Sequence, residues 1–266
     1  MRTTRTCLLL AALLATAACR RRFERRVARG HGNAQQAPPP SEPVAALYDR
    51  SPLEGPGDVP PIVVVYGDGR VIRRVGDGAA ARLIEGRVAP DVVQGLVRDH
   101  ADLAQVARST DCPEVSDGAS VDIVLRVGDR LEGRHAYGVM LDDPADAGCT
   151  APPPAFARVW RRLLALRVAD ERPWLPDAIE LALRPLPSEN SGTPWPPELP
   201  APPTAPASQD GGVASVVVDG RHRARAIEFL RSAAWTGALL DGRRWSLEVR
   251  DLVPGHALLN EARERR

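Results

Sequence analysis

Short apolar runs interrupted by glycine and aspartate predict β-hairpins in the first half of the chain. Two hairpins are expected, at residues 62–73 and 120–141, each with an Asp-Gly or Gly-Asp pair between its apolar runs. Asp and Gly tolerate the positive φ of a tight hairpin turn, so these pairs favour antiparallel strands. A further short strand is expected at residues 82–88, although residues 79–85 fit a helical turn equally well.

Apolar residues at helical spacing predict two helices. The first opens at Pro90 and runs to about residue 107, and the second follows the prolines at 152–154 and runs to about residue 168. The order hairpin, strand, helix, hairpin, helix predicts an α+β fold, in which helices pack on one face of an antiparallel sheet built from hairpins.

The remainder of the chain predicts a smaller C-terminal α+β part. A strand is expected at residues 213–218, a helix at 221–234 and a closing hairpin at 235–252. The prolines between residues 184 and 206 exclude a helix or a central strand in that stretch. So small a core, with so long an insertion, favours a subdomain that depends on the main domain.

These patterns divide the chain into successive parts with distinct composition. They are a signal peptide at 1–19, a basic and then proline-rich tether at 20–60, a main α+β domain at 61–169, a connecting strand at 170–183, a proline-rich loop or linker at 184–211, a C-terminal subdomain at 212–256 and a charged tail at 257–266. An extended tether of this composition would hold the folded body away from a membrane.

The first residues have the order of an export signal. Arg2 and Arg5 precede the apolar run at 7–14, which leads through small residues to Cys19. The run is too short to span a bilayer, which takes about 20 apolar residues. This segment resembles the leader of bacterial lipoproteins, and the resemblance implies that Cys19 receives a diacylglyceryl group and becomes the N-terminus. Cleavage after Ala18, with a free Cys19 and a soluble secreted product, is the alternative.

The body carries a second resemblance. Its Val-x-Tyr-Gly-Asp-Gly-Arg-Val hairpin at 64–71 and its Thr110-Asp111 turn are similar to those of uncharacterised exported proteins of GC-rich bacteria. These motifs are structural turns, so the resemblance implies a compartment and a fold but no particular chemistry.

The amino-acid composition excludes several kinds of catalytic site and argues against one kind of partner. The chain contains no lysine, so a P-loop lysine, a Schiff-base lysine and a Ser-Lys catalytic pair are excluded. Its 35 basic residues are nearly balanced by 34 acidic ones without aromatic interleaving, so we do not expect nucleic acid as a partner. The arginines just after Cys19 are suited to anionic lipid headgroups, or are simply a solvated part of the tether.

Two cysteines lie in the body, Cys112 and Cys149. In an oxidising compartment an isolated pair is most simply a disulfide. The alternatives, a metal pair or a reactive thiol, lack histidine or cysteine partners at ligand spacing.

Candidate binding residues are few. His135 and Tyr137 fall on the same face of a predicted strand, and Trp174 and Trp195 lie in proline-rich surroundings, where an exposed indole would contact a glycan ring or a protein groove. Packing of the proline-rich loop onto the sheet accounts for the tryptophans equally. There is no Gly-x-Ser-x-Gly elbow and no His-x-x-x-His pair in the sequence, and no cofactor is expected.

The sequence therefore predicts a membrane-anchored lipoprotein of the bacterial cell envelope that acts as a binding or structural module. Its expected partners are the membrane, reached through Cys19, and an envelope protein or cell-wall glycan. The alternative is an exported hydrolase or glycan-active enzyme whose site is assembled only in the fold. A pocket that gathers His135 with two carboxylates or a serine would favour the enzyme.

Overall fold

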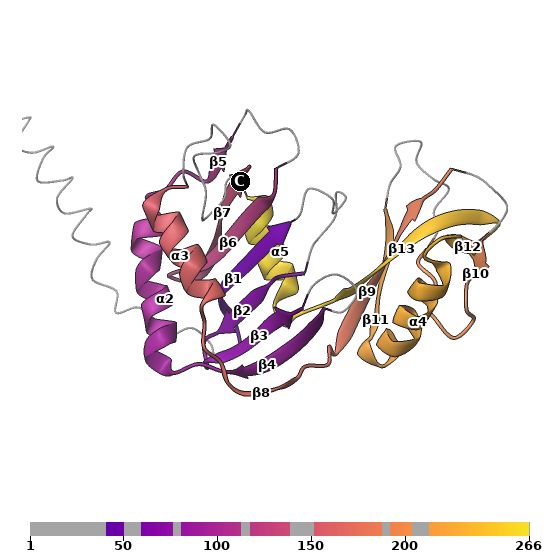
Figure 1. Cartoon of the computed structure of the whole chain (residues 1–266), viewed down its shortest axis with the longest axis horizontal. Coiled ribbons are helices and arrows are strands. Elements are labelled where there is room, and N and C mark those ends of the chain that lie inside the picture. The colour runs from indigo at the N-terminus through magenta and orange to yellow at the C-terminus, as the bar shows by residue number, and fades with distance from the viewer. Residues whose placement is uncertain are drawn as a thin grey trace, which may run out of the picture. The chain divides into compact units, whose positions relative to one another are not determined.

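The computed structural model describes residues 41–50, 60–76, 81–112, 118–138, 152–187, 192–203 and 213–265. These residues form one sheet of eight strands, one sheet of five strands and four α-helices (Figure 1). Strand pairing is antiparallel apart from one parallel pair in each sheet. The predicted α+β class, with a main sheet built from hairpins and a smaller C-terminal part, is therefore confirmed.

The larger sheet has the strand order β5-β7-β6-β1-β2-β3-β4-β8. Two of its hairpins are those predicted from the sequence, β2 with β3 and β6 with β7. Their turns place Gly69 and Gly128 at φ angles of 82° and 61°, which glycine adopts without strain. The strands are β1 (Pro43–Arg50), β2 (Val63–Tyr66), β3 (Arg70–Val75), β4 (Arg82–Arg87), β5 (Ser109–Asp111), β6 (Ser120–Val127), β7 (Arg130–Tyr137) and β8 (Ala169–Pro173).

Strand β1 corrects the prediction that residues 20–60 form a tether. It lies near the centre of the larger sheet, paired with β2 on one side and β6 on the other, and most of its side chains are buried. Proline is tolerated at the first residue of a strand, so Pro43 does not prevent this pairing. The rest of the predicted tether, residues 20–40 and 51–59, lies outside the described residues.

Two helices, α2 (Pro90–Leu103) and α3 (Pro154–Leu164), cover one face of the larger sheet (Figure 1). Both begin at a proline, whose missing N–H is one that the first helical turn leaves unpaired. Both end a few residues before the predicted boundary. Their contribution to the core on this face includes Val93, Leu96, Phe156, Val159, Trp160 and Leu163.

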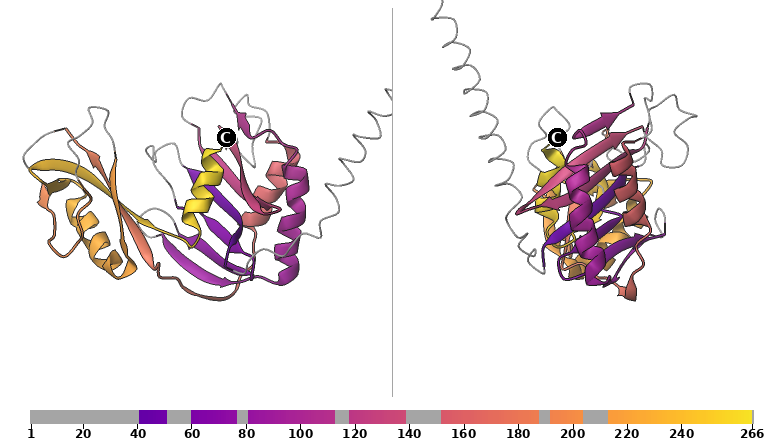
Figure 2. Two further views of the ribbon diagram at one scale, coloured as in Figure 1. Left: turned by 180° about the vertical axis from the view of Figure 1, so that it is seen from behind. Right: turned by 90° about the vertical axis from the view of Figure 1, so that its left-hand side faces the viewer.

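The opposite face of the larger sheet is covered by α5 (His256–Glu264), which Figure 2 shows from behind. This helix replaces the charged tail predicted at residues 257–266, and it covers the second face of a sheet that was predicted to carry helices on one face. Leu259 and Ala262 are its buried apolar residues, and they pack in a second core with residues such as Tyr48. Only two of its four apolar residues are buried, so its apolar pattern does not match a buried helical face closely enough to reveal the helix.

The loop before α5 is tied to the same face by Tyr66. Its hydroxyl donates a hydrogen bond to the carbonyl oxygen of Pro254, with an O···O distance of 3.1 Å. Burial raises the pKa of the Tyr66 phenol well above its ordinary value, so the neutral donor form is favoured.

The smaller sheet has the strand order β10-β12-β13-β9-β11. One of its faces packs against α4 (Arg223–Ala233), which follows a 3-10 turn at Gly220–His222. The core between them includes Leu181, Phe229 and Trp245, and it is distinct from the two cores of the larger sheet. The strands are β9 (Ala178–Pro185), β10 (Thr193–Pro194), β11 (Ala214–Asp219), β12 (Ala238–Leu240) and β13 (Arg243–Asp251).

The boundaries between the two sheets differ from those predicted. Residues 170–183 were expected to form one connecting strand, but they contribute to β8 of the larger sheet and to β9 of the smaller one. The proline-rich stretch 184–211 includes β10, which pairs in parallel with β12. A strand of two residues is enough for this pairing, so the prolines do not prevent it.

Candidate functional site

Polar side chains form a row across four strands of the larger sheet, on the face that α5 covers. The strand register places Tyr48 of β1 opposite Asp122 of β6, Asp122 opposite His135 of β7, and His135 beside Ser109 of β5. Residues opposite one another across neighbouring strands share a face of the sheet. Four polar side chains from separate parts of the sequence are thereby gathered in one line.

Asp122 and His135 are the centre of this row. The Nδ1 atom of His135 lies 2.7 Å from Oδ1 of Asp122, which is a short hydrogen bond. The Asp122 residue is only 5% exposed, and the His135 side chain is 11% exposed. Because a carboxylate only accepts, Nδ1 carries the proton of this bond, and the Nε2 atom is directed away from Asp122.

Arg263 of α5 binds the other oxygen of Asp122. Its Nε and Nη2 atoms each donate to Oδ2 of Asp122 at 3.1 Å, and its guanidinium carbon lies 4.1 Å from the centre of the Tyr48 ring. Arg263 is itself 5% exposed. A buried carboxylate is tolerated only when it is paired and hydrogen-bonded, and here the two oxygens have an arginine and a histidine as partners.

The approach of α5 to the sheet depends on Gly133 of β7. A Cβ atom at this position would lie 2.5 Å from the carbonyl oxygen of Ala262 in α5, closer than side-chain carbons come to backbone oxygens. The absence of a side chain lets the helix lie close enough for Arg263 to reach Asp122. This requirement is not visible in the sequence, since it is a contact between distant segments.

On its outer side, His135 is near the exposed carboxylate of Asp111 in the edge strand β5. The distance from Nε2 of His135 to Oδ1 of Asp111 is 3.9 Å, which is longer than a hydrogen bond. The hydroxyl of Ser109 lies 2.8 Å from the same Asp111 oxygen and donates to it. His135 therefore lies between one buried and one exposed carboxylate, with a serine close by.

This arrangement suits His135 to transfer a proton, but it does not activate Ser109 as a nucleophile. A histidine whose Nδ1 is held by a buried aspartate presents Nε2 as a base. Within the described ranges, however, the hydroxyl of Ser109 is hydrogen-bonded to Asp111 and makes no hydrogen bond to the imidazole. No group of three or more histidine, cysteine, aspartate or glutamate side chains suited to a metal ion occurs among the residues that the structure describes.

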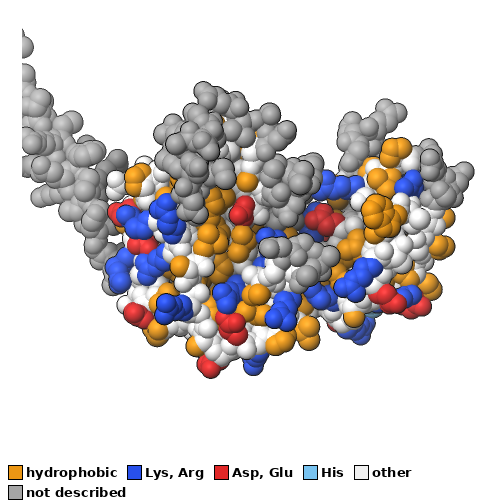
Figure 3. Space-filling view, viewed as in Figure 1, with side chains coloured by type: hydrophobic (Ala, Val, Ile, Leu, Met, Phe, Trp, Pro, Cys, Tyr) orange, Lys and Arg blue, Asp and Glu red, His pale blue; other side chains and the backbone are white. Residues whose placement is uncertain are grey.

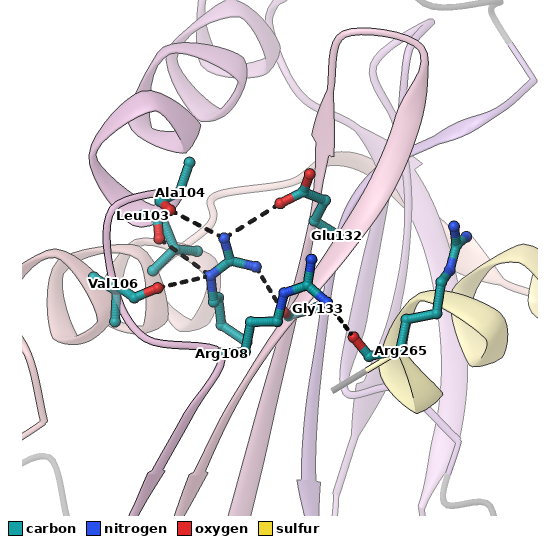
Figure 4. Close-up of polar contacts among 8 residues, drawn as sticks. Leu103, Ala104, Val106, Arg108, Glu132, Gly133 and Arg265 are labelled. Atoms are coloured by element: carbon teal, nitrogen blue, oxygen red, sulfur yellow. Dashed lines mark hydrogen bonds and ion pairs between the residues drawn. The ribbon is translucent and has the colours of Figure 1, made fainter.

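Arg134 lies on the other face of β7 and is a buried cation that the sequence analysis did not single out. Its Nε atom donates to the carbonyl oxygens of Leu103 at 3.3 Å and Val106 at 3.1 Å, and Nη2 donates to that of Ala104 at 3.2 Å (Figure 4). The last carbonyls of a helix have no partner within the helix. Arg134 thus caps the C-terminal end of α2, and its positive charge interacts favourably with the negative end of the helix dipole.

Of the other predicted binding residues, the structure places Tyr137 near His135 and the two tryptophans elsewhere. Tyr137 lies on the same face of β7 as His135, and its hydroxyl accepts a hydrogen bond from the N–H of Gly118 at 3.1 Å. Trp174 is 9% exposed and belongs to the core beneath α5. Trp195 packs edge to face on Phe229, with ring centroids 5.3 Å apart, and donates to the carbonyl oxygen of Leu199. Packing therefore accounts for both tryptophans.

The exposed indole of the chain is instead Trp235, which follows α4. It is 94% exposed, and the Arg244 guanidinium donates to its carbonyl oxygen at 3.5 Å. A tryptophan so exposed is suited to contact a partner. Its surroundings in the sequence are those of an ordinary helix end, so only the structure identifies it.

The predicted anchor and disulfide are not tested by the structure. Cys19 and Cys149 lie outside the described residues, and Cys112 is 4% exposed. None of the helices in the described ranges is long and apolar enough to cross a bilayer.

The surface charge is mixed. Basic side chains on the face shown in Figure 3 are spread over both sheets and have acidic ones among them. Several charged side chains of the described residues form ion pairs, such as Arg158–Asp102 at 2.6 Å and Arg172–Glu85 at 2.7 Å. Comparison with protein-family models, curated proteins and solved structures finds no match for this chain.

Proposed function

We propose that this chain is a lipid-anchored protein of the bacterial cell envelope, and that its folded body is a non-enzymatic binding or structural module. The location rests on the leader, in which a positive start, a short apolar run and small residues precede Cys19. The body then faces the non-cytoplasmic side of the membrane, where an envelope protein or cell-wall glycan is within its reach.

The observation that supports a non-enzymatic body is how the polar row is bonded. Asp122 binds Arg263 and thereby fixes α5, while Ser109 donates to Asp111 and not to His135. The first contact holds the helix on the sheet, and the second lies within the edge strand β5. A hydrolase would instead direct its serine at the base.

The anchor is tested by intact mass and membrane fractionation after expression in a bacterial host. We expect wild type to gain the mass of a diacylglyceryl group and to remain with the membrane, because the thiol of Cys19 is the acceptor. Cys19→Ser is expected to lose both properties.

The matched control is Cys7→Ser, which alters a cysteine within the apolar run and is expected to keep both the added mass and the membrane retention. A soluble wild-type product that begins at Cys19 without added mass would contradict the anchor and support secretion. An unprocessed chain in the cytoplasm would contradict export altogether.

The second candidate, an exported hydrolase, is favoured by one observation. Nδ1 of His135 is bonded to the buried Asp122, and its Nε2 faces Asp111, which is bonded to Ser109. Such neighbours are typical of a histidine that acts as a general base. Under this alternative His135 would activate a water molecule or a hydroxyl of the substrate.

The two functions are separated by assaying the full chain against ester, amide and glycoside substrates, together with His135→Gln. The non-enzymatic proposal predicts no turnover that depends on His135. The control is His222→Gln, which alters a histidine in the 3-10 turn before α4. Turnover that survives in His222→Gln and disappears in His135→Gln would replace the proposal by the hydrolase.

A further inference from the structure

A hollow of about 80 Å³ lies beside the edge of β7 and the end of α5. It is small enough that it suits an ionic group of a few atoms better than a ring or a peptide. Its lining includes Arg108, Arg265, Glu132 and Gly133, which are labelled in Figure 4. Arg130, Leu131, Arg134 and Ala262 complete the lining.

Four arginines line the hollow, and two of them are held by hydrogen bonds to backbone carbonyl oxygens. Arg134 caps α2 and also pairs with Glu132 at 3.2 Å, so most of its donors are engaged. Arg108 uses one Nη1 donor on the carbonyl oxygen of Arg265 at 2.9 Å. The fork of a guanidinium carries five N–H donors, so Arg108 keeps most of its donors for another partner.

The remaining two arginines are less engaged. Arg265 makes an exposed pair with Glu261 at 3.3 Å. Arg130 is exposed, and its side chain has no hydrogen bond or ion pair to any residue that the structure describes. Helix capping, which explains Arg134 and Arg108, gives no reason for Arg130 to be at this position.

Backbone N–H groups of β7 also face this edge of the sheet. The N–H of His135 donates to the carbonyl oxygen of Arg108 at 2.8 Å, on the side of β7 that β5 covers. N–H groups two residues apart along a strand point the same way, so those of Gly133 and Leu131 do too. Strand β5 pairs only with His135, Ala136 and Tyr137, so no strand among the described residues pairs with this part of the edge.

The electrostatic balance of the hollow is positive. Four arginines line it, against the carboxylate of Glu132 in the lining and that of Glu261 on Arg265. Guanidinium groups bind phosphate and other oxyanions through paired N–H donors, and uncovered sheet edges add further donors. Cationic side chains and backbone N–H groups together make an oxyanion site.

We propose that this hollow binds the oxygens of a phosphate group, with Arg130 and Arg108 as the cationic ligands and the Gly133 N–H as a neutral donor. The phosphate of a free metabolite and that of an anionic lipid headgroup both present anionic terminal oxygens. The inference goes beyond the proposed function and does not require the lipid anchor, since binding of phosphate from solution is enough to establish it.

The test is titration of the full chain with inorganic phosphate in a phosphate-free buffer, followed by isothermal calorimetry and by ³¹P line broadening. We expect saturable binding to wild type. Loss of one charge-assisted ligand in Arg130→Gln is expected to weaken affinity about tenfold. Arg130→Lys keeps the charge without the fork and is expected to fall between the two.

The matched control is Arg98→Gln, which removes an exposed charge of α2 outside the hollow and is expected to bind like wild type. Equal affinities of wild type and Arg130→Gln, or no saturable binding at all, would overturn the proposal. Competition by short-chain phosphatidylglycerol below its micelle concentration identifies a lipid headgroup as a ligand, and its failure to compete assigns the site to free phosphate. Neither result depends on whether Cys19 is lipidated.

Discussion

Replacing Arg263 by methionine is expected to lower the free energy of unfolding by about 3–5 kcal/mol, the range for breaking one partner of a buried ion pair. Asp122 is 5% exposed and receives two hydrogen bonds from Arg263, so the variant leaves a buried carboxylate under α5 without its arginine partner. Methionine is unbranched and fills part of the same space, which keeps the change mainly electrostatic. Urea unfolding followed by circular dichroism measures the difference.

Two further variants separate the ion pair from the helix. Arg265→Met makes the same substitution two residues later in the chain, at a side chain that is 50% exposed, and is expected to change stability by at most about 0.5 kcal/mol. The double variant Arg263→Met with Asp122→Asn removes both charges and is expected to recover part of the loss, because the buried charge is gone. Equal effects of Arg263→Met and Arg265→Met would contradict the role of the pair.

Local signals in the sequence predict those parts of the fold whose geometry is decided by neighbouring residues. The Asp68-Gly69 turn gave the β2–β3 hairpin, because the positive φ that the turn needs is a property of glycine itself. The starts of α2 and α3 were also predicted, because a proline at the first helical position is a local property of that residue. Each of these features is specified within a few residues.

The features that the sequence did not reveal are specified by distant partners. Strand β1 is a strand because β2 and β6 pair with it, and its flanking prolines suggest a tether until that pairing is seen. Helix α5 is held by Arg263, whose partner Asp122 lies 141 residues earlier in the chain. Without knowledge of this contact, the charged residues at 257–266 are predicted to form a tail.

The candidate site was predicted in part. Alternation along β7 correctly places His135 and Tyr137 on one face, because side chains two apart in a strand point the same way. The partners of His135 come from two other strands and from α5, and only the register brings them together. Trp235 could not be distinguished from the other tryptophans, since exposure depends on what the surrounding elements leave uncovered.

Reduction of the exported protein is expected to lower its free energy of unfolding by about 4 kcal/mol if Cys112 and Cys149 are bonded, as the sequence predicts. Closing the long loop between them restricts the unfolded chain, so the folded state gains by comparison. Cys112→Ala and Cys149→Ala are each expected to cost a similar amount. The measurement is urea unfolding of wild type and of each variant, with and without dithiothreitol.

The double variant decides whether the two cysteines act as a pair. If they are bonded, either single substitution already removes the crosslink, so the double variant is expected to be little less stable than either single one. Reductant should then have no effect on any of the three variants. Additive losses, or a wild type that is indifferent to dithiothreitol, would contradict the disulfide.

The position of Cys112 connects this crosslink to the polar row. Cys112 directly follows Asp111 of the edge strand β5, and its N–H donates to the carbonyl oxygen of Tyr137 at 2.9 Å. Strand β5 has three residues and pairs on one side only, so little else fixes it to the sheet. A bond at Cys112 would therefore hold Asp111 and Ser109 beside His135. Reduction is expected to loosen the outer side of the candidate site before the Asp122–Arg263 pair on its inner side is disturbed, a difference that amide hydrogen exchange would resolve strand by strand.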